Sequence, residues 1–429
     1  MMKQFNSKKK IFINYIDIIK SYDFFYYLTN IIICSIFCYI YFFSLSNIIN
    51  LWTYSEIHLN YSQGFIRRGL LGQVMLYLND IGLSKKIFFS SIYFIISIIN
   101  IIIFLKILRS TIKDKWIFFF FSFNPSLILF SFYDLGGYAR SEIFGILLLL
   151  VHTFIFIKVK NRNIDLKIYK KIFISLLVPG IYISTLIHEI NILTIFFHLF
   201  TTYNILKFYK KFKLLYLIKI FTPLIFLIPI VYYFYTKQID SSTIDMMFNS
   251  LNEKENVNIW IWKSIFTSIN ERKTELQYML YPKTNLLLYI FIFAFYTFPI
   301  FIFFYVWNRI GLYKLYISII VVMPIFLLFF IGRDWGRWIN FTIFILFCTN
   351  IQFLFFYVKK IQYNFRNQML NFIFILFITL QLTLTRIPHC CNLIEKNIGL
   401  FGGIITKSII FYKLINSEID IKERFKNYK

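Results

Sequence analysis

The chain has 429 residues, of which 59% are hydrophobic and only 15% are charged. A soluble domain is about half apolar and about a quarter charged, so this composition excludes an ordinary soluble fold. The net charge of +26 does not indicate a nucleic-acid-binding protein, because the basic residues lie in short gaps between apolar runs, as in the cytoplasmic loops of membrane proteins. We therefore expect membrane lipid, and no nucleic acid, among the partners.

The apolar runs are about 20 residues long, the length that a helix needs to cross a bilayer. Backbone groups in lipid must be hydrogen-bonded internally, and the alternation typical of a membrane barrel is absent. We expect one all-α transmembrane domain, residues 1–429, that forms a polytopic helical bundle with about 11 or 12 membrane-spanning helices. The expected helices are 28–49, 86–107, 116–133, 142–158, 172–187, 190–206, 219–236, 286–307, 314–331, 339–358 and 370–386. In the C-terminal tail, 387–429, the segment 400–415 could be an interfacial or a twelfth helix.

Lysine and arginine give the orientation. They gather before the first helix and in every second gap after it, which places these gaps and the N-terminus in the cytoplasm. The Ile-, Lys-, Asn- and Phe-rich composition is typical of an AT-rich bacterial gene, so we expect the bacterial cytoplasmic (inner) membrane. The other gaps then lie outside, including a large extracytoplasmic loop at 237–285 that could form short amphipathic helices. Residues 68–80 are too short to span and are expected to be an interfacial or re-entrant helix.

Nucleotide and metal motifs are missing from the chain. There is no Walker loop, no Gly-rich dinucleotide turn and no Gly-x-Ser-x-Gly, and the five cysteines do not have a zinc spacing. We therefore expect no cofactor and no metal.

The segment from Gly64 to Gly72 combines Arg67 and Arg68 with glycines at a predicted outer boundary. Arginine binds phosphate through two parallel hydrogen bonds, and glycine permits a close backbone approach. The two arginines could therefore hold a lipid-linked diphosphate. The alternative is that they reach into the headgroup region.

The segment Gly332-Arg-Asp-Trp-Gly-Arg-Trp338 is the densest polar group between two apolar runs. Ionisable residues at such a position are costly and are functional candidates. Asp334 could be a base or could orient Arg333 or Arg337. Trp335 and Trp338 could stack on a sugar or belong to the interfacial aromatic belt.

Two further outer gaps carry candidates. Arg140 and Glu142 follow Asp134 across a Gly-Gly turn, and an internal ion pair is their alternative role. His188 and Glu189 join two apolar runs, where a buried Glu beside His could have a raised pKa suited to proton abstraction. A hydrogen bond at the helix corner is the alternative. The pair is not a His-Glu-x-x-His zinc motif.

In size, helix number, large outer loop and composition the chain resembles the Wzy-type O-antigen and capsule polymerases. The resemblance implies polymerisation of a surface polysaccharide or lipopolysaccharide by glycosyl transfer from undecaprenyl diphosphate to a lipid-linked acceptor, outside the cytoplasm. It also implies a polyprenyl-(di)phosphate-linked glycan, a chain-length regulator and a flippase as partners. The diphosphates would be held by Arg67, Arg68, Arg140, Arg333 and Arg337. The base that deprotonates the acceptor hydroxyl would be Asp334, Glu189, Glu142 or His188.

Three other functions stay open. A GT-C-like glycosyltransferase with a polyprenyl-phosphate sugar donor usually has an acidic base in the first outer loop, where this chain has Glu56 but lacks the usual second acid. A flippase or transporter is expected to carry charges along its helix interiors, and the predicted helix middles are nearly free of charge. A passive scaffold leaves the Arg-Asp-Arg turn unexplained.

Overall fold

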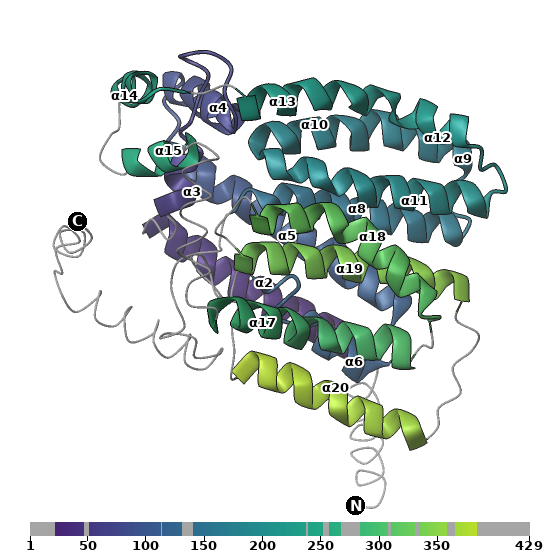
Figure 1. Cartoon of the computed structure of the whole chain (residues 1–429). Coiled ribbons are helices and arrows are strands. Elements are labelled where there is room, and N and C mark those ends of the chain that lie inside the picture. The colour runs from purple at the N-terminus through teal and green to yellow at the C-terminus, as the bar shows by residue number, and fades with distance from the viewer. Residues whose placement is uncertain are drawn as a thin grey trace, which may run out of the picture.

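A computed structural model describes ten parts of the chain: residues 22–46, 51–112, 114–130, 140–236, 239–251, 257–266, 284–307, 310–330, 335–357 and 365–383. These parts contain helices and turns, and none of them contains a strand. Most of the helices run side by side in one bundle (Figure 1).

The helices fall into three groups by length and continuity. The long ones are α2 (Tyr22–Ser46), α5 (Lys85–Thr111), α8 (Glu142–Lys160), α17 (Thr284–Phe301), α19 (Trp335–Tyr357) and α20 (Phe365–Thr383). Other helices consist of segments that follow one another without a loop. The first such series is α9 (Leu166–Ile172), η2 (Phe173–Leu177) and α10 (Val178–Ile187), and across the single residue His188 it is followed by η3 (Glu189–Thr194) and α11 (Ile195–Phe208). The later series are α12 (Leu214–Phe221), η4 (Thr222–Phe226) and α13 (Leu227–Thr236); η5 (Ile302–Trp307) after α17; and α18 (Tyr313–Phe326) with η6 (Leu327–Phe330). The short ones are α3 (Leu51–Glu56), α4 (Gly69–Asp80), α6 (Lys115–Ser122), α14 (Ser241–Asn249) and α15 (Ile259–Phe266).

Within the described residues, seven helical segments are long and apolar enough to cross a membrane. They are Asp23–Phe42, Lys85–Thr111, Glu142–Lys160, Leu166–Ile187, Leu214–Phe234, Tyr289–Val306 and Trp335–Leu354. The expected all-α membrane protein is confirmed at this level, and every predicted helix range overlaps a helix.

The predicted helix at 116–133 is wrong in its length. Helix α6 ends at Ser122, and residues 123–129 form turns and irregular backbone. The Asn124 side chain accepts hydrogen bonds from the backbone and the hydroxyl of Ser126, and Pro125 between them has no N–H to continue a helix. Asn340 of α19 donates to the Ser126 carbonyl at 2.7 Å and so holds this turn against the bundle core.

The two ends of the bundle differ in chemistry. One end, here called the capped end, carries α3, α4, α14 and α15 (Figure 1). Helix formation by 69–80, and by parts of 237–285, is therefore confirmed. The other end, the basic end, has lysines and arginines where α5, α8 and α11 end and α9 begins: Lys106, Arg109, Lys158, Lys160, Lys167, Lys170 and Lys207. Residues 252–256, 267–283 and the tail 387–429 lie outside the described residues.

Helix α19 occupies the centre of the bundle. Its window Trp335–Leu354 is fully buried, and its mean hydropathy of 1.2 is the lowest of the seven spans. A helix that contacts protein on all sides can carry polar side chains, because neighbouring helices supply hydrogen-bond partners. α19 contacts α5, α8, α11, α17 and α18, so it places its first residues among theirs at the capped end.

Candidate functional site

Eight charged or titratable side chains meet at the capped end of the bundle. This charged cluster consists of Glu56, Arg67, Arg68, Arg140, Glu142, His188, Glu189 and Arg337. Seven of the eight are buried, and the side chain of Arg68 is 11% exposed. Unpaired charges are not tolerated at such depth, so the cluster depends on its internal pairing.

Arg68 is the main connector of the cluster. Its Nε and Nη2 donate to the two carboxylate oxygens of Glu189 at 2.9 and 2.8 Å, while Nη1 lies 3.3 Å from Glu56. Arg67 adds a longer pairing to Glu189, at 3.9 Å. Two parallel charge-assisted hydrogen bonds are the strongest pairing that arginine forms with a carboxylate. Arg68 therefore ties the α3 end and the α10–η3 corner to the start of α4.

The glycines of the Arg67–Gly72 motif explain how α4 reaches this position. A Cβ on Gly72 would lie 1.9 Å from the carbonyl oxygen of Leu59, and one on Gly69 would lie 2.3 Å from the Tyr61 ring. The two glycines are three residues apart and thus share one helix face. Their small size lets α4 lie directly on residues 57–61. Arg68 itself has φ of 63°, an uncommon conformation that its bonds to Glu189 help to hold.

His188 lies between the three carboxylates. Its Nδ1 accepts a hydrogen bond from the Ile190 backbone at 3.3 Å, so the neutral ring carries its proton on Nε2. Nε2 is 3.7 Å from Glu142 and 3.9 Å from Glu56. Burial and the charge of Arg68 lower the pKa of His188, despite the nearby carboxylates. The ring is therefore neutral at pH 7, with Nε2 near two acids but too far from either for a hydrogen bond.

Glu189 is held in its ionised form. Burial alone raises its pKa, but the charges of Arg68 and Arg67 and the hydrogen bonds from Arg68 outweigh burial and hold the pKa well below its ordinary value. The prediction of a raised pKa at Glu189 is therefore wrong. A carboxylate that is already engaged by an arginine fork is poorly suited to take up a proton.

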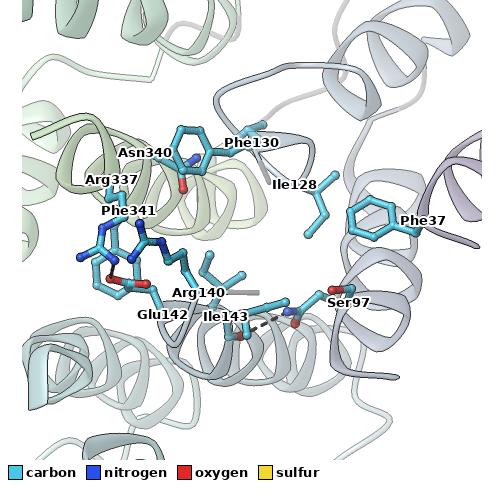
Figure 2. Close-up of a pocket in the computed structure, with 13 residues that line it drawn as sticks. Phe37, Ser97, Ile128, Phe130, Arg140, Glu142, Ile143, Arg337, Asn340 and Phe341 are labelled. Carbon is cyan, nitrogen blue, oxygen red and sulfur yellow. Dashed lines mark hydrogen bonds and ion pairs between the residues drawn. The ribbon is translucent and has the colours of Figure 1, made fainter. Parts of the chain in front are cut away.

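Glu142 has a different environment, because it lines a cavity. Its Oε1 is 3.2 Å from Nη1 of Arg337, and Arg140 lies beside both (Figure 2). The cavity measures about 40 Å³, which is enough to admit a small polar group. Its other polar wall residues are Ser97, Asn100 and Asn340. Its apolar wall residues are Phe37, Leu127, Ile128, Phe130, Ile143, Ile146 and Phe341.

The cavity wall is mixed. In Figure 2 Arg140, Arg337 and Glu142 gather beside Phe341, while Ile128 and Phe37 lie farther away with Ser97. Most of its polar residues come from helices α5, α8 and α19. The cavity therefore brings charged and apolar side chains together at the edge of the charged cluster.

Helix α15 covers part of the cluster. The indole N–H of Trp262 donates to the Ser55 carbonyl at 2.6 Å, and the Asn258 backbone donates to the Ser55 hydroxyl at 2.9 Å. The Arg67 guanidinium lies 5.3 Å from the centre of the Phe266 ring. Residues 258–266 of the predicted outer loop therefore pack against the capped end through specific contacts.

The two tryptophans of the Arg333–Trp338 segment do not offer a face to a sugar. Trp335 is 6% exposed and packs against the Tyr289 and Phe329 rings. Trp338 is 3% exposed and lies under the Arg337 guanidinium. The predicted sugar-stacking role does not fit these positions, and both residues pack in the bundle interior.

Seven of the eleven predicted site residues lie together in the charged cluster: Arg67, Arg68, Arg140, Glu142, His188, Glu189 and Arg337. Arg333 and Asp334, like Asp134, lie outside the described residues. Glu56, which the sequence offered only for the GT-C-like alternative, belongs to the cluster and accepts a hydrogen bond from Ser141 at 3.3 Å. Its place in the segment that follows the first long helix is the signal in the sequence.

No three His, Cys, Asp or Glu side chains among the described residues are placed to hold a metal ion. No protein-family model, curated protein or solved structure matches the chain, so its function is argued from the geometry of the charged cluster and its cavity.

Proposed function

We propose that the charged cluster is the active site of a membrane-embedded glycosyltransferase whose donor is a glycan linked to a polyprenyl (di)phosphate. The cavity that joins two guanidinium groups and a carboxylate to an apolar wall carries this proposal. A lipid-linked sugar presents a phosphate, an isoprenoid chain and a reacting carbon, and the three parts of the cavity wall are suited to them.

The charge balance favours an anionic ligand. Among the described residues, the cluster has four guanidinium groups and three carboxylates, and His188 is neutral. Electrostatic interactions are strong in such a buried site. A phosphate bound between Arg140 and Arg337 matches the planar arginine fork.

Glu142 is the best-placed general base. Of the three described carboxylates in the cluster, it is the one that lines the cavity, whereas Glu189 is held by Arg68. A substrate phosphate on Arg337 weakens the pairing of that arginine with Glu142. The released carboxylate takes the proton of the acceptor hydroxyl, and the acceptor oxygen attacks the anomeric carbon. The carbon–oxygen bond to phosphate breaks, its electron pair stays on the phosphate, and Arg140 and Arg337 stabilise the added charge.

The resemblance to Wzy-type polymerases favours polymerisation of a surface polysaccharide as the specific role. The distribution of lysine and arginine supports an inner-membrane orientation with the basic end in the cytoplasm and the capped end outside. Lipid-linked intermediates carry their own leaving group, so a reaction on the outer face needs no nucleotide.

A second candidate is a GT-C-like transferase with a polyprenyl-phosphate sugar donor. The position of Glu56 favours it, because an acid in the segment after the first long helix lies 2% exposed inside the cluster. This candidate uses the same face, the same cavity and the same chemistry, but its donor carries a single phosphate.

Deletion of the gene tests the proposal and separates the candidates. The surface polysaccharide is run on a gel and the lipid-linked intermediates are extracted alongside. A single complete repeat unit with the ladder lost supports a polymerase. A retained ladder whose repeat lacks one sugar supports the GT-C-like transferase. An unchanged profile contradicts both.

Point variants in the deletion strain test the assigned residues. Arg337→Gln and Glu142→Gln are expected to abolish the product while the protein remains inserted at normal level, because each removes a cavity charge. Lys263→Gln is the control, since its ion pair with Asp245 at the capped end is about half exposed. Normal product from Glu142→Gln would exclude that residue as the base.

A further inference from the structure

A second buried polar network lies inside the bundle, away from the charged cluster. Nδ1 of His152 is 2.8 Å from Nδ1 of His198, and Nε2 of His152 is 3.1 Å from the Tyr169 hydroxyl. The Tyr169 hydroxyl is 2.7 Å from that of Thr202. All four residues are 0% exposed. Thr202, Tyr169, His152 and His198 are here called the histidine chain.

The two imidazoles meet edge to edge. Their planes differ by 19° and their centres are 5.1 Å apart, so the two Nδ1 atoms face each other nearly in plane. Two neutral rings can share this hydrogen bond only if one Nδ1 carries a proton and the other does not. The same heavy-atom positions therefore accept two opposite proton arrangements.

In the first arrangement every donor is directed toward His198. Thr202 donates to Tyr169, Tyr169 donates to Nε2 of His152, Nδ1 of His152 donates to Nδ1 of His198, and His198 carries its proton on Nε2. When Nε2 of His198 releases that proton and Thr202 receives another, each shared proton moves along one hydrogen bond. All four residues are neutral again and every donor is reversed. One proton has entered at Thr202 and one has left from His198.

The position of the histidine chain connects it to both ends of the bundle. His152 lies ten residues after Glu142 on α8, about 15 Å along the helix axis, and His198 lies ten residues after His188. Tyr169 belongs to α9, which begins at the basic end. At the cluster, Asn191 donates to the Ser141 carbonyl beside Glu142. The histidine chain therefore lies on the same helical stretches as Glu142 and His188, about three helical turns away.

A neighbouring network shows what a purely structural role looks like. Asn204 donates to the side chain of Gln352 at 3.1 Å, and Gln352 donates to Thr201 at 2.7 Å. Amide groups hold helices together but have no second tautomer. The histidine chain differs in two ways. The donor and acceptor of each of its hydrogen bonds can exchange roles, and Nε2 of His198 has no hydrogen-bond partner among the described residues. Ionisable side chains in a membrane interior are rare and commonly form proton relays.

We propose that Thr202, Tyr169, His152 and His198 form an intramembrane proton relay between the basic end of the bundle and the charged cluster. The relay is a further activity and does not depend on the glycosyl transfer proposed above. If the cluster does transfer glycosyl groups, the relay gives the proton taken from the acceptor a path out of a buried site.

Proton flux into vesicles tests the relay. The purified full-length chain is reconstituted into liposomes that contain a pH-sensitive dye, and a potassium diffusion potential is applied with valinomycin. The wild-type protein is expected to admit protons several-fold faster than empty liposomes. Tyr169→Phe, which keeps the ring and removes the connecting hydroxyl, and His198→Leu are both expected to return the flux to the empty-liposome rate.

Thr153→Val is the matched control, because this buried hydroxyl on α8 bonds to the Leu149 carbonyl of its own helix and lies outside the histidine chain. It is expected to conduct like the wild type. Wild-type flux equal to that of empty liposomes, or undiminished flux in Tyr169→Phe, would overturn the relay. Because the readout is proton movement, a negative result leaves the glycosyltransferase proposal standing, and loss of polysaccharide synthesis does not affect the relay.

Discussion

The charged cluster and the histidine chain share two stretches of the chain, α8 and the segment from His188 to α11, yet they use different chemistry. The cluster pairs arginines with glutamates at the capped end. The histidine chain, deeper in the bundle, joins imidazole and hydroxyl groups that can all be neutral. Full charges occur at the capped end and neutral groups occur deeper in the bundle, because the cost of an ion rises with depth.

The two networks should differ in how much a substitution lowers the free energy of unfolding. In a charged network, removal of one partner is strongly destabilising, since the other charge stays buried and unpaired. A neutral network loses only the net value of its hydrogen bonds. Four changes, from the largest expected effect to the smallest, test this difference.

Removal of Arg68 is expected to have the largest effect. Arg68→Ala leaves Glu189 and Glu56 buried without their main cation, so we expect a loss of about 3–5 kcal/mol in the free energy of unfolding, measured by denaturation in detergent. Arg109→Ala is the control: its pair with Asp23 is 41% and 62% exposed and should contribute about 0–1 kcal/mol. Equal losses in the two variants would mean that the cluster is solvated and not a buried charged network.

Acid is expected to weaken the capped end through its neutral histidines. His58 donates from Nδ1 to the Tyr54 carbonyl, and burial, together with the charge of Lys85, lowers its pKa to about 4 despite that bond. The unfolded chain binds a proton near pH 6.5, so the contribution of His58 is complete above pH 6.5 and is lost as the pH falls toward 4. The loss is about 3 kcal/mol.

His58→Gln keeps a donor for Tyr54 but does not titrate. Its unfolding free energy, measured by denaturation at several pH values, should therefore change less between pH 6.5 and 4 than that of the wild type. The lowered pKa of His188 acts in the same direction, so some dependence on pH remains. An unchanged pH dependence in the variant would show that His58 is accessible to protons in the folded protein.

Packing of α4 supports the charged cluster and gives a smaller effect. In Gly72→Ala the new Cβ meets the Leu59 carbonyl, which is backbone and cannot rotate away, so we expect a loss of about 1–3 kcal/mol. Gly82→Ala meets open space but has φ of +78°, and should cost about 1–2 kcal/mol. Thermal unfolding of both variants measures the difference. A milder effect at Gly72 would mean that α4 is not seated on residues 57–61.

The two networks also differ in how far the sequence predicts them. The sequence shows four members of the cluster as charged or titratable residues that interrupt apolar runs: Arg67, Arg68, His188 and Glu189. The glycines beside the two arginines indicate close packing there. The arrangement of these charges does not follow from the sequence, because pairing across the 121 residues between Arg68 and Glu189 depends on helix packing. That pairing also reversed the pKa expected for Glu189.

The histidine chain was missed for a different reason. His152 and His198 are single polar residues within apolar helices, and each alone is more often a satisfied core residue than a functional group. Helix periodicity shows which face a residue occupies, but not which residue of another helix it meets. Similarly, the length of the run 116–133 predicted a spanning helix, while the Asn124 side chain and Pro125 ended it at Ser122.

The smallest effect is expected for Tyr169→Phe. The substitution removes two interhelical hydrogen bonds, to His152 and Thr202, and retains the packing of the ring. Such bonds average about 0.6 kcal/mol in membrane bundles, so a loss of about 1 kcal/mol is expected on thermal unfolding. Tyr209→Phe, which removes one bond to the Ile164 carbonyl at the basic end, should lose about half as much. A loss comparable to that of Arg68→Ala would show that the histidine chain carries charge. A small loss means that any fall in proton flux in Tyr169→Phe comes from the missing hydroxyl and not from unfolding.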